Sequence, residues 1–256
     1  MPASVPSKVS RVSDQPTIVL HMLPPSHPCL TVIAALEHKG LAYERNVLVG
    51  GEHNEKIEGI YGAGKRTVPG ILVGDEPVHG SVAILERLEQ IAPDPPLYPE
   101  QIASEVREAE LWGDREFQDL GRRLPFGAMH FRPEAMGSFG GAGALDPPGV
   151  DFAITYARGA WRYHGITAER LAEDLAGLPA KIDHIDALAG AGIVGGEQPT
   201  AADLQIGATV LVLLTVGDLL PLIEGRPAER IARSWFPDYP GAIPAGAYPA
   251  GWVPAL

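Results

Sequence analysis

The sequence predicts two units of different class, an α/β domain followed by an all-α helical-bundle domain. Up to residue 91, apolar β-branched runs alternate with helix-spaced apolar stripes, in the order strand, helix, strand, helix, strand, strand, helix. A proline cluster at residues 93–96 then breaks the chain, and only helical patterns follow. We therefore predict a flexible arm over residues 1–16, the α/β domain over 17–93 and the helical domain over 100–256.

Local signals justify each N-terminal element. A hydroxyl residue followed by Pro28 is typical of a helix start, and Ser26 stands in that place. Gly74-Asp75 is a two-residue turn signal between two short strands. The predicted strands cover residues 17–22, 43–49, 70–73 and 76–78, and the predicted helices begin at Ser26, Glu55 and Ser81.

The second unit reads as helices separated by breaks. Thr200-Ala-Ala-Asp203 has the form of a capping box and opens the most apolar helix of the chain. We predict further helices over residues 100–123, 151–164 and 167–189, with a Gly- and Pro-rich connection over 124–149 and a similar tail after Trp235.

Composition excludes several functions. The 256 residues carry a net charge of -12 and no dense Lys/Arg run, so we expect no nucleic-acid partner. The longest apolar run, 204–220, is interrupted by Gln205 and Asp218, which predicts a core helix and no membrane contact.

The eight histidines lack metal-ligand spacing, so we expect no metal. A single cysteine and an N-terminus without an apolar signal fit a cytoplasmic location.

Four stretches, in this order, resemble the cytosolic glutathione S-transferase family. They are Ala34-Ala-Leu-Glu-His-Lys-Gly-Leu-Ala-Tyr-Glu44, Thr67-Val-Pro-Gly-Ile-Leu72, Val78-His-Gly-Ser-Val-Ala-Ile84 and Gln198-Pro-Thr-Ala-Ala-Asp203. The resemblance extends from Thr17 to about Ile223. It implies a thioredoxin-like N-terminal domain that binds glutathione, a helical C-terminal domain, and a symmetric homodimer.

A thiol-conjugating enzyme must stabilise a thiolate near neutral pH, and a helix N-terminus with a hydroxyl group supplies suitable donors. The resemblance places Ser26 in this role; alternatively Ser26 only caps the helix. Cys29 stands where the second cysteine of a Cys-x-x-Cys motif would stand. It is either a small buried apolar residue or the site of a mixed disulfide with glutathione.

The resemblance also assigns residues to the tripeptide. A cis peptide bond between Val68 and Pro69, as opposed to an ordinary trans bond, would turn the Val68 backbone toward the cysteinyl unit. Ser81, otherwise a plain N-cap, would hold the γ-glutamyl carboxylate. Gly80 departs from the family pattern, because an acidic residue usually precedes this serine. The remaining candidates, for the glycyl carboxylate, are His53 and Lys65; each is otherwise a solvated loop residue.

The resemblance implies a detoxification-type reaction that conjugates or adds glutathione to a small hydrophobic electrophile. Two alternatives stay open: a glutathione-dependent thiol reductase that uses Cys29, and a non-catalytic binding protein that keeps the fold. Large apolar side chains available for the second-substrate pocket are Trp112, Phe117, Phe126, Met129, Phe131 and Tyr156.

Overall fold

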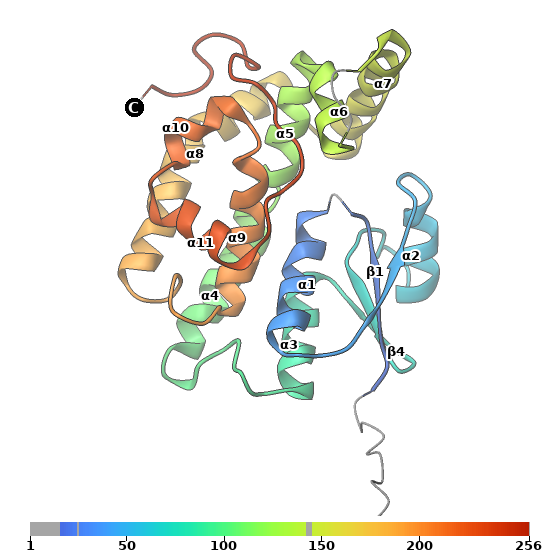
Figure 1. Cartoon of the computed structure of the whole chain (residues 1–256), viewed down its shortest axis with the longest axis vertical. Helices are drawn as coiled ribbons and strands as arrows, with labels where there is room; N and C mark the ends of the chain where they lie inside the picture. The colour runs from blue at the N-terminus through green and yellow to red at the C-terminus, as the bar shows by residue number, and fades with distance from the viewer. Residues whose placement is uncertain (1–15, 25, 142–144, 256) are drawn as a thin grey trace, which may run out of the picture.

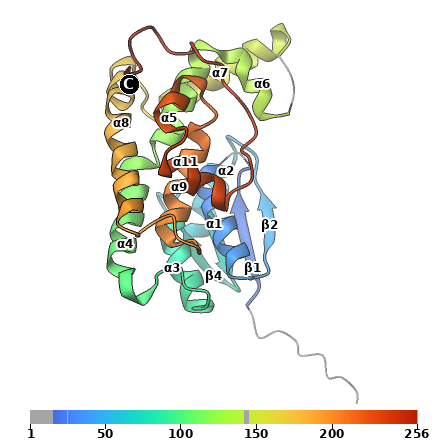
Figure 2. The same cartoon turned by 60° about the vertical axis from the view of Figure 1, so that its left-hand side comes forward.

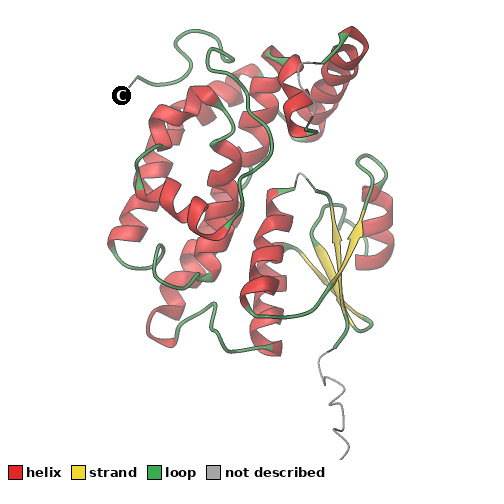
Figure 3. Cartoon of the chain, viewed as in Figure 1, coloured by secondary structure: helices red, strands yellow, loops and turns green. Residues whose placement is uncertain are grey.

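The computed structural model describes residues 16–24, 26–141 and 145–255, so nearly all of the predicted arm lies outside the described residues. A sheet part and a helical part lie side by side (Figure 1). Two helices of the sheet part lie between its strands and the helical part, and a third covers the opposite face of the sheet (Figures 1 and 3). This is the predicted fold class.

The sheet part has four strands in the order β2-β1-β3-β4. β1 pairs with β2 in parallel and with β3 antiparallel, and β3 and β4 form the predicted hairpin. Its elements, in chain order, are β1 (Ile18–Met22), α1 (His27–His38), β2 (Glu44–Val47), α2 (His53–Tyr61), β3 (Gly70–Val73), β4 (Glu76–His79) and α3 (Ser81–Ile91).

The helical part contains α4 (Ala103–Trp112), α5 (Leu120–Phe131), α6 (Met136–Phe139), α7 (Pro147–Tyr163), α8 (Ala168–Gly190), α9 (Ala201–Leu213), α10 (Leu220–Ile223) and α11 (Pro227–Trp235). Short 3₁₀ turns lie at Glu100–Ile102, Pro133–Ala135 and Gly217–Leu219, and a π-helical turn lies at Gly113–Phe117.

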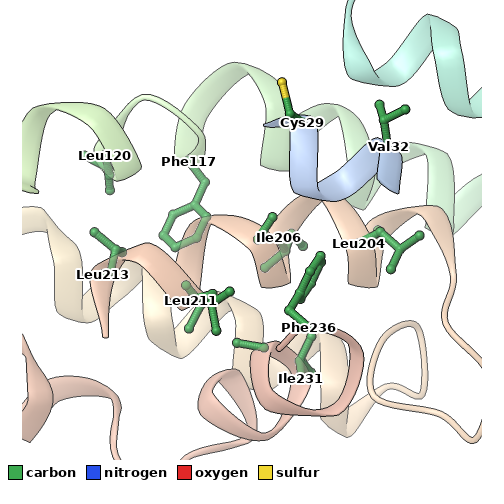
Figure 4. Close-up of a cluster of buried hydrophobic side chains, with 14 of the residues drawn as sticks. Cys29, Val32, Phe117, Leu120, Leu204, Ile206, Leu211, Leu213, Ile231 and Phe236 are labelled. Carbon is green, nitrogen blue, oxygen red and sulfur yellow. The ribbon is translucent and has the colours of Figure 1, made fainter. Parts of the chain in front are cut away.

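α9 is the centre of the core, because every one of its residues is buried. Its side chains Leu204 and Ile206 lie between α1 and α11 (Figure 4). The Thr200–Asp203 capping box is present as predicted. Among the described residues, no helix combines the length and the apolar character needed to cross a membrane.

Two predictions for the region before α7 were wrong. The predicted helix over residues 100–123 is interrupted by the π-helical turn, and the predicted connection over 124–149 begins as helix, because α5 runs to Phe131. Burial outweighs local propensity here: Pro125 and Gly127 are both buried within α5. A side chain at position 127 would collide with Leu171 of α8, so glycine permits this close approach.

Residues 236–248, the C-terminal strap, run back along the side of the helical part that faces α1 (Figures 1 and 2). Ile243 forms a bridge with Val216, and the Tyr248 hydroxyl donates to the Leu124 carbonyl at 2.8 Å. The Asp218 carboxylate accepts hydrogen bonds from the backbone N–H groups of residues 246, 247 and 248. The strap therefore has a fixed path although it contains no helix.

Candidate functional site

The topology gathers most of the predicted site residues at one end of the sheet. Gly70 at the start of β3 lies opposite His21 near the end of β1, and also opposite His79 at the end of β4. The starts of α1 and α3 follow β1 and β4 at this same end. The Gly80 N–H donates to the Pro69 carbonyl at 3.0 Å, which joins the proline loop to the start of α3.

Val68 presents free backbone groups at this end. The Val68–Pro69 peptide bond is cis, as predicted. Val68 is 7% exposed, yet among the described residues neither its N–H nor its C=O has a hydrogen-bond partner. Buried backbone groups are nearly always paired, so this edge is suited to an extended peptide ligand.

The start of α3 offers a matching anion site. Ser81 is 4% exposed, and within the described chain its hydroxyl has no hydrogen-bond partner. The N-cap residue, Gly80, has no side chain with which to cap the first N–H groups, and its φ of 89° lies where other residues are strained. Free N–H groups and a hydroxyl at a helix start can hold a carboxylate.

A network that the sequence did not indicate, buried at His21 and Tyr61 and exposed at Thr67, supports the proline loop. His21 Nδ1 lies 2.7 Å from the Tyr61 hydroxyl, and His79 Nε2 lies 2.7 Å from the Thr67 carbonyl oxygen. The Tyr61 ring fills the space beside Gly70, where a side chain would collide with it. Contacts between residues 40 positions apart leave no local sequence signal.

Ser26 is the N-cap of α1 and is half-buried, but its side chain accepts no hydrogen bond from the first turn. It lies beside Cys29, which is fully buried. Burial raises the pKa of the Cys29 thiol to about 11, and hydrogen bonds from the Ser26 side chain and the Leu23 backbone offset this only in part. A protonated, buried thiol is a poor nucleophile.

The residues on the opposite side of the first turn of α1 join the two parts of the molecule. His27 is buried, and its Nε2 donates to the Gln118 carbonyl at 3.1 Å. Burial keeps the pKa of His27 well below its usual value, so the ring is neutral. Thr31 donates to the Leu204 carbonyl at 3.2 Å. Position 121 must be small, because a side chain there would collide with His27.

The candidates for the glycyl carboxylate lie on the α2 side. His53 is half-buried, its pKa is lowered by burial, and its Nδ1 is buried without a partner among the described residues. Lys65 is exposed in the loop after α2. A neighbour that the sequence did not indicate, Asn54, donates to the Arg66 carbonyl at 2.7 Å and to the Tyr163 hydroxyl at 3.0 Å. Asn54 thus links the sheet part to α7.

The candidates for the second-substrate pocket lie in different places. Trp112 and Phe117 stack at 5.3 Å, and Phe117 is fully buried in the core. Phe126 lies 6.1 Å from Tyr156 of α7. Of the other two candidates, Met129 is buried and Phe131 packs against Trp252 at 6.1 Å.

Comparison with known proteins shows which family the sheet part resembles. Residues 20–96 match the family described as glutathione S-transferase, N-terminal domain. No curated protein matches the chain in sequence.

Three solved structures illustrate the likeness in fold. A glutathione S-transferase from Rhodospirillum rubrum aligns with a TM-score of 0.53 and 20% identity over 85% of this chain and 86% of that one. Beta-etherase LigF from a Sphingobium strain gives 0.55 and 19% over 75% and 82%. FzlA from C. crescentus gives 0.52 and 20% over 88% and 96%.

At such identities these structures establish the fold, and the activity must be argued from the residues of this chain. The family match covers the sheet part, which holds the loop with the cis proline and the starts of α1 and α3. Residues 20–96 therefore match the N-terminal domain of the glutathione S-transferase family, and the chain as a whole shares the two-part fold of these solved structures.

Proposed function

We propose that this protein binds glutathione and adds the glutathione sulfur to a small hydrophobic electrophile. The Val68 backbone pairs with the cysteinyl unit beside Pro69, and Ser81 with the α3 start holds the γ-glutamyl carboxylate at Gly80. His53 and Lys65 face the glycyl end. Two structural neighbours are named as enzymes, a glutathione S-transferase and a beta-etherase, which supports an enzymatic role.

The observation that carries this proposal is the unpaired backbone of Val68. A buried N–H and C=O side by side match the C=O and N–H of one peptide unit, as when a strand is added to a sheet edge. The unpartnered Ser81 hydroxyl lies at the same end of the sheet. Together they fit a short peptide that carries a carboxylate, and glutathione is such a peptide.

Ser26 donates a hydrogen bond to the glutathione sulfur and lowers its pKa. Each unit of that shift requires about 1.4 kcal/mol of preferential stabilisation of the thiolate, the size of one charge-assisted hydrogen bond. When the electrophile is an organic halide, the sulfur–carbon bond forms and the carbon–halogen bond breaks. The halide leaves with the bonding pair, and the thiol proton goes to water.

The burial of Cys29 argues against the thiol reductase alternative. Mixed-disulfide chemistry needs an accessible thiolate, whereas Cys29 is fully buried and its pKa is raised to about 11. A Cys29→Ser variant should therefore keep the transferase turnover. Loss of a glutathione-dependent disulfide reductase activity in this variant would instead support the reductase.

A non-catalytic binding protein is the second candidate, and Gly80 is the observation that favours it. No carboxylate stands at this position to meet the ligand's α-amino group, so affinity for glutathione depends on fewer contacts. Measurable glutathione binding without any rate enhancement, across a panel of electrophiles, would support this candidate.

Calorimetric titration with glutathione tests the proposed site. Ser81→Ala should weaken binding about tenfold, since it removes a hydrogen bond to a carboxylate worth about 1.4 kcal/mol. Ser26→Ala should leave affinity nearly unchanged but raise the pKa of the bound thiol, followed by the ultraviolet absorbance of the thiolate. Ser104→Ala, an exposed serine on α4, is the matched control.

Absence of binding at millimolar glutathione would overturn the proposal, as would a Ser104→Ala effect equal to that of Ser81→Ala. The proposal also includes a symmetric homodimer, which light scattering would detect, a cytoplasmic location, and domain limits at residues 17–93 and 100–256. Limited proteolysis between residues 93 and 100 tests those limits.

A further inference from the structure

Side chains from two other elements hold the carbonyl groups of the two residues before Val68. The Arg66 carbonyl accepts a hydrogen bond from Asn54 Nδ2 of α2 at 2.7 Å, and the Thr67 carbonyl oxygen lies 2.7 Å from Nε2 of His79 in β4. In a trans peptide unit, which is planar, the C=O and the following N–H point in opposite directions. The unit between Thr67 and Val68 is trans, so the His79 contact fixes the direction of the Val68 N–H. The Asn54 contact fixes the unit before it.

The same Asn54 amide group also reaches the helical part. Its Nδ2 atom carries two hydrogens, and it also donates to the hydroxyl of Tyr163 in α7 at 3.0 Å. Asn54 is half-buried and Tyr163 is exposed, on the side of the molecule where α2 and α7 lie in Figure 1. This contact is separate from the hydrogen bonds of His27 and Thr31, which join α1 to the helical part.

The α7 end of this contact is anchored to α5. Trp161 Nε1 donates to the Phe126 carbonyl at 2.9 Å, and the His164 ring stacks on the Phe126 ring with centroids 5.6 Å apart. The Tyr163 ring meets the His164 ring edge-on at 5.0 Å. Because residues on both sides of Tyr163 are held against α5, its hydroxyl is a fixed point to which α2 is tied.

The loop between α2 and Val68 is held by α2 at two further points. Glu58 Oε1 accepts from the Gly64 N–H at 2.8 Å, and the Glu58 carboxylate lies 3.6 Å from the Arg66 guanidinium. The loop therefore moves together with α2. Whatever fixes α2 also fixes the backbone on the N-terminal side of Val68.

We propose that Asn54 is a positioning residue of the glutathione site, and that through it Tyr163 sets the direction of the Val68 backbone groups. This inference rests on the proposed function and extends it to a residue of the helical part that does not contact the tripeptide. Without the contact between Asn54 and Tyr163, the loop is aligned by the sheet part alone. Alignment before binding raises affinity, because less ordering is required when the ligand arrives.

Calorimetric titration with glutathione tests this coupling. Tyr163→Phe, which removes only the hydroxyl, should weaken binding about two- to fivefold, and Asn54→Ala, which removes both hydrogen bonds, about five- to tenfold. The double variant should bind as Asn54→Ala does, since both changes break the same contact. Tyr43→Phe is the matched control: its hydroxyl accepts from Arg45 at 2.7 Å within the sheet part, and its loss should change affinity less than about twofold.

Two results of the titration would overturn the proposal. One is a double variant weakened by the product of the two single effects, and the other is a Tyr43→Phe effect equal to that of Tyr163→Phe. Circular dichroism and the urea midpoint of each variant check the fold, which Asn54→Ala should keep because alanine is the better helix former.

Steady-state kinetics separate positioning from a general structural role. With chlorodinitrobenzene as the electrophile, both single variants should raise KM for glutathione by the same factors as its dissociation constant. Their kcat should stay within about twofold, because Ser26 is unchanged. A lowered kcat at unchanged KM reports fewer folded molecules and would overturn the positioning role.

Amide hydrogen exchange without ligand, followed by NMR, decides the inference even if the protein does not bind glutathione. The Gly80 N–H, which donates to the Pro69 carbonyl at 3.0 Å, reports on the proline loop. Its exchange should accelerate about threefold or more in Tyr163→Phe and Asn54→Ala, and less than about twofold in Tyr43→Phe. Unchanged exchange in both variants would overturn the positioning role. Faster exchange without glutathione binding would support that role and contradict the proposed function alone.

Discussion

α1 and α9 both begin at a hydroxyl residue, but their N-termini are completed differently. At α9, Thr200 Oγ1 accepts from the Asp203 N–H at 3.2 Å, and the Asp203 carboxylate accepts from the N–H groups of Thr200 at 2.9 Å and Gly195 at 2.6 Å. At α1, the Ser26 side chain makes no such bond to its helix. Side chains therefore satisfy backbone N–H groups at the start of α9, whereas the Ser26 side chain satisfies none at the start of α1.

The difference separates a structural cap from a candidate catalytic residue of the same chemical kind. Asp203 is fully buried and its hydrogen bonds hold α9 in the core, so its role ends with the fold. Ser26 is half-buried and faces a thiol, so its hydroxyl can serve another molecule. A hydroxyl that does not satisfy its own helix is the one to test for function.

The largest expected effect follows from disrupting the capping box at the start of α9. Asp203→Ala removes the acceptor for two backbone N–H groups and the Thr200 hydroxyl, and should lower the free energy of unfolding by about 3 kcal/mol. Ser26→Ala should lower it by less than about 1 kcal/mol. Urea denaturation measures both; comparable losses would mean that Ser26 is also a structural cap.

A buried acid away from both helix starts tests how a group that serves only the fold affects the free energy of unfolding. Glu110 is 1% exposed, and its oxygens lie 3.1 and 2.9 Å from the Tyr98 hydroxyl. Burial, helped by Glu86, raises the pKa of Glu110 from 4.5 to about 8, although Tyr98 and Arg107 oppose the shift. The carboxyl group is therefore protonated in the folded protein near neutral pH.

Since the unfolded chain releases this proton at lower pH, the contribution of Glu110 to stability is complete below pH 4.5 and is lost as pH rises through about 8. Glu110→Gln should flatten this dependence and add roughly 2 kcal/mol or more near pH 8. Urea midpoints at several pH values measure it. The same slope in both proteins would assign the pH dependence to other groups.

The next prediction concerns the backbone conformation of Gly80, at the start of α3. Gly80 has a φ of 89°, so Gly80→Ala should cost about 1–2 kcal/mol through backbone strain alone, since no atom lies within 4 Å of the new methyl group. Gly59, within α2 and equally unobstructed, is the matched control, and its alanine variant should gain up to about 1 kcal/mol. Thermal unfolding compares them, and a shift of the same sign would reject the strain argument.

The smallest expected effect concerns the neighbour of Ser26. Because Cys29 is fully buried with a raised pKa, Ellman's reagent should modify the folded protein at less than about a tenth of the rate seen in urea. The absorbance of the released thiolate measures both rates. Rapid modification of the folded chain would mean that the start of α1 opens and that Cys29 is available for chemistry.

Features encoded within a few residues could be predicted from sequence. The capping box, the hairpin at Gly74-Asp75 and the start of α1 after Ser26 all rest on neighbours in the chain. The cis bond between Val68 and Pro69 was predicted from a motif that is also short, residues 67–72. These short signals also named the main candidate site residues, which the structure brings together at one end of the sheet.

Features that join distant segments could not be predicted in this way. The link from Asn54 to Tyr163 spans 109 residues, and Tyr239 belongs to a Pro- and Gly-rich tail that resembles a loose end in sequence. α5 was missed for a related reason, because burial against α8 outweighs the local effect of Pro125 and Gly127. Packing partners decide these features, and a single sequence does not name them.

The position of the strap at the end of the chain has a consequence for biosynthesis. Ribosomes add about 5–20 residues per second, and domains generally fold from the N-terminus onward. Ser26 therefore emerges roughly 10 to 40 s before Tyr239, at that rate of synthesis. During this interval the nascent chain can form the sheet part, but it still lacks the strap that later runs back along the helical part (Figure 1).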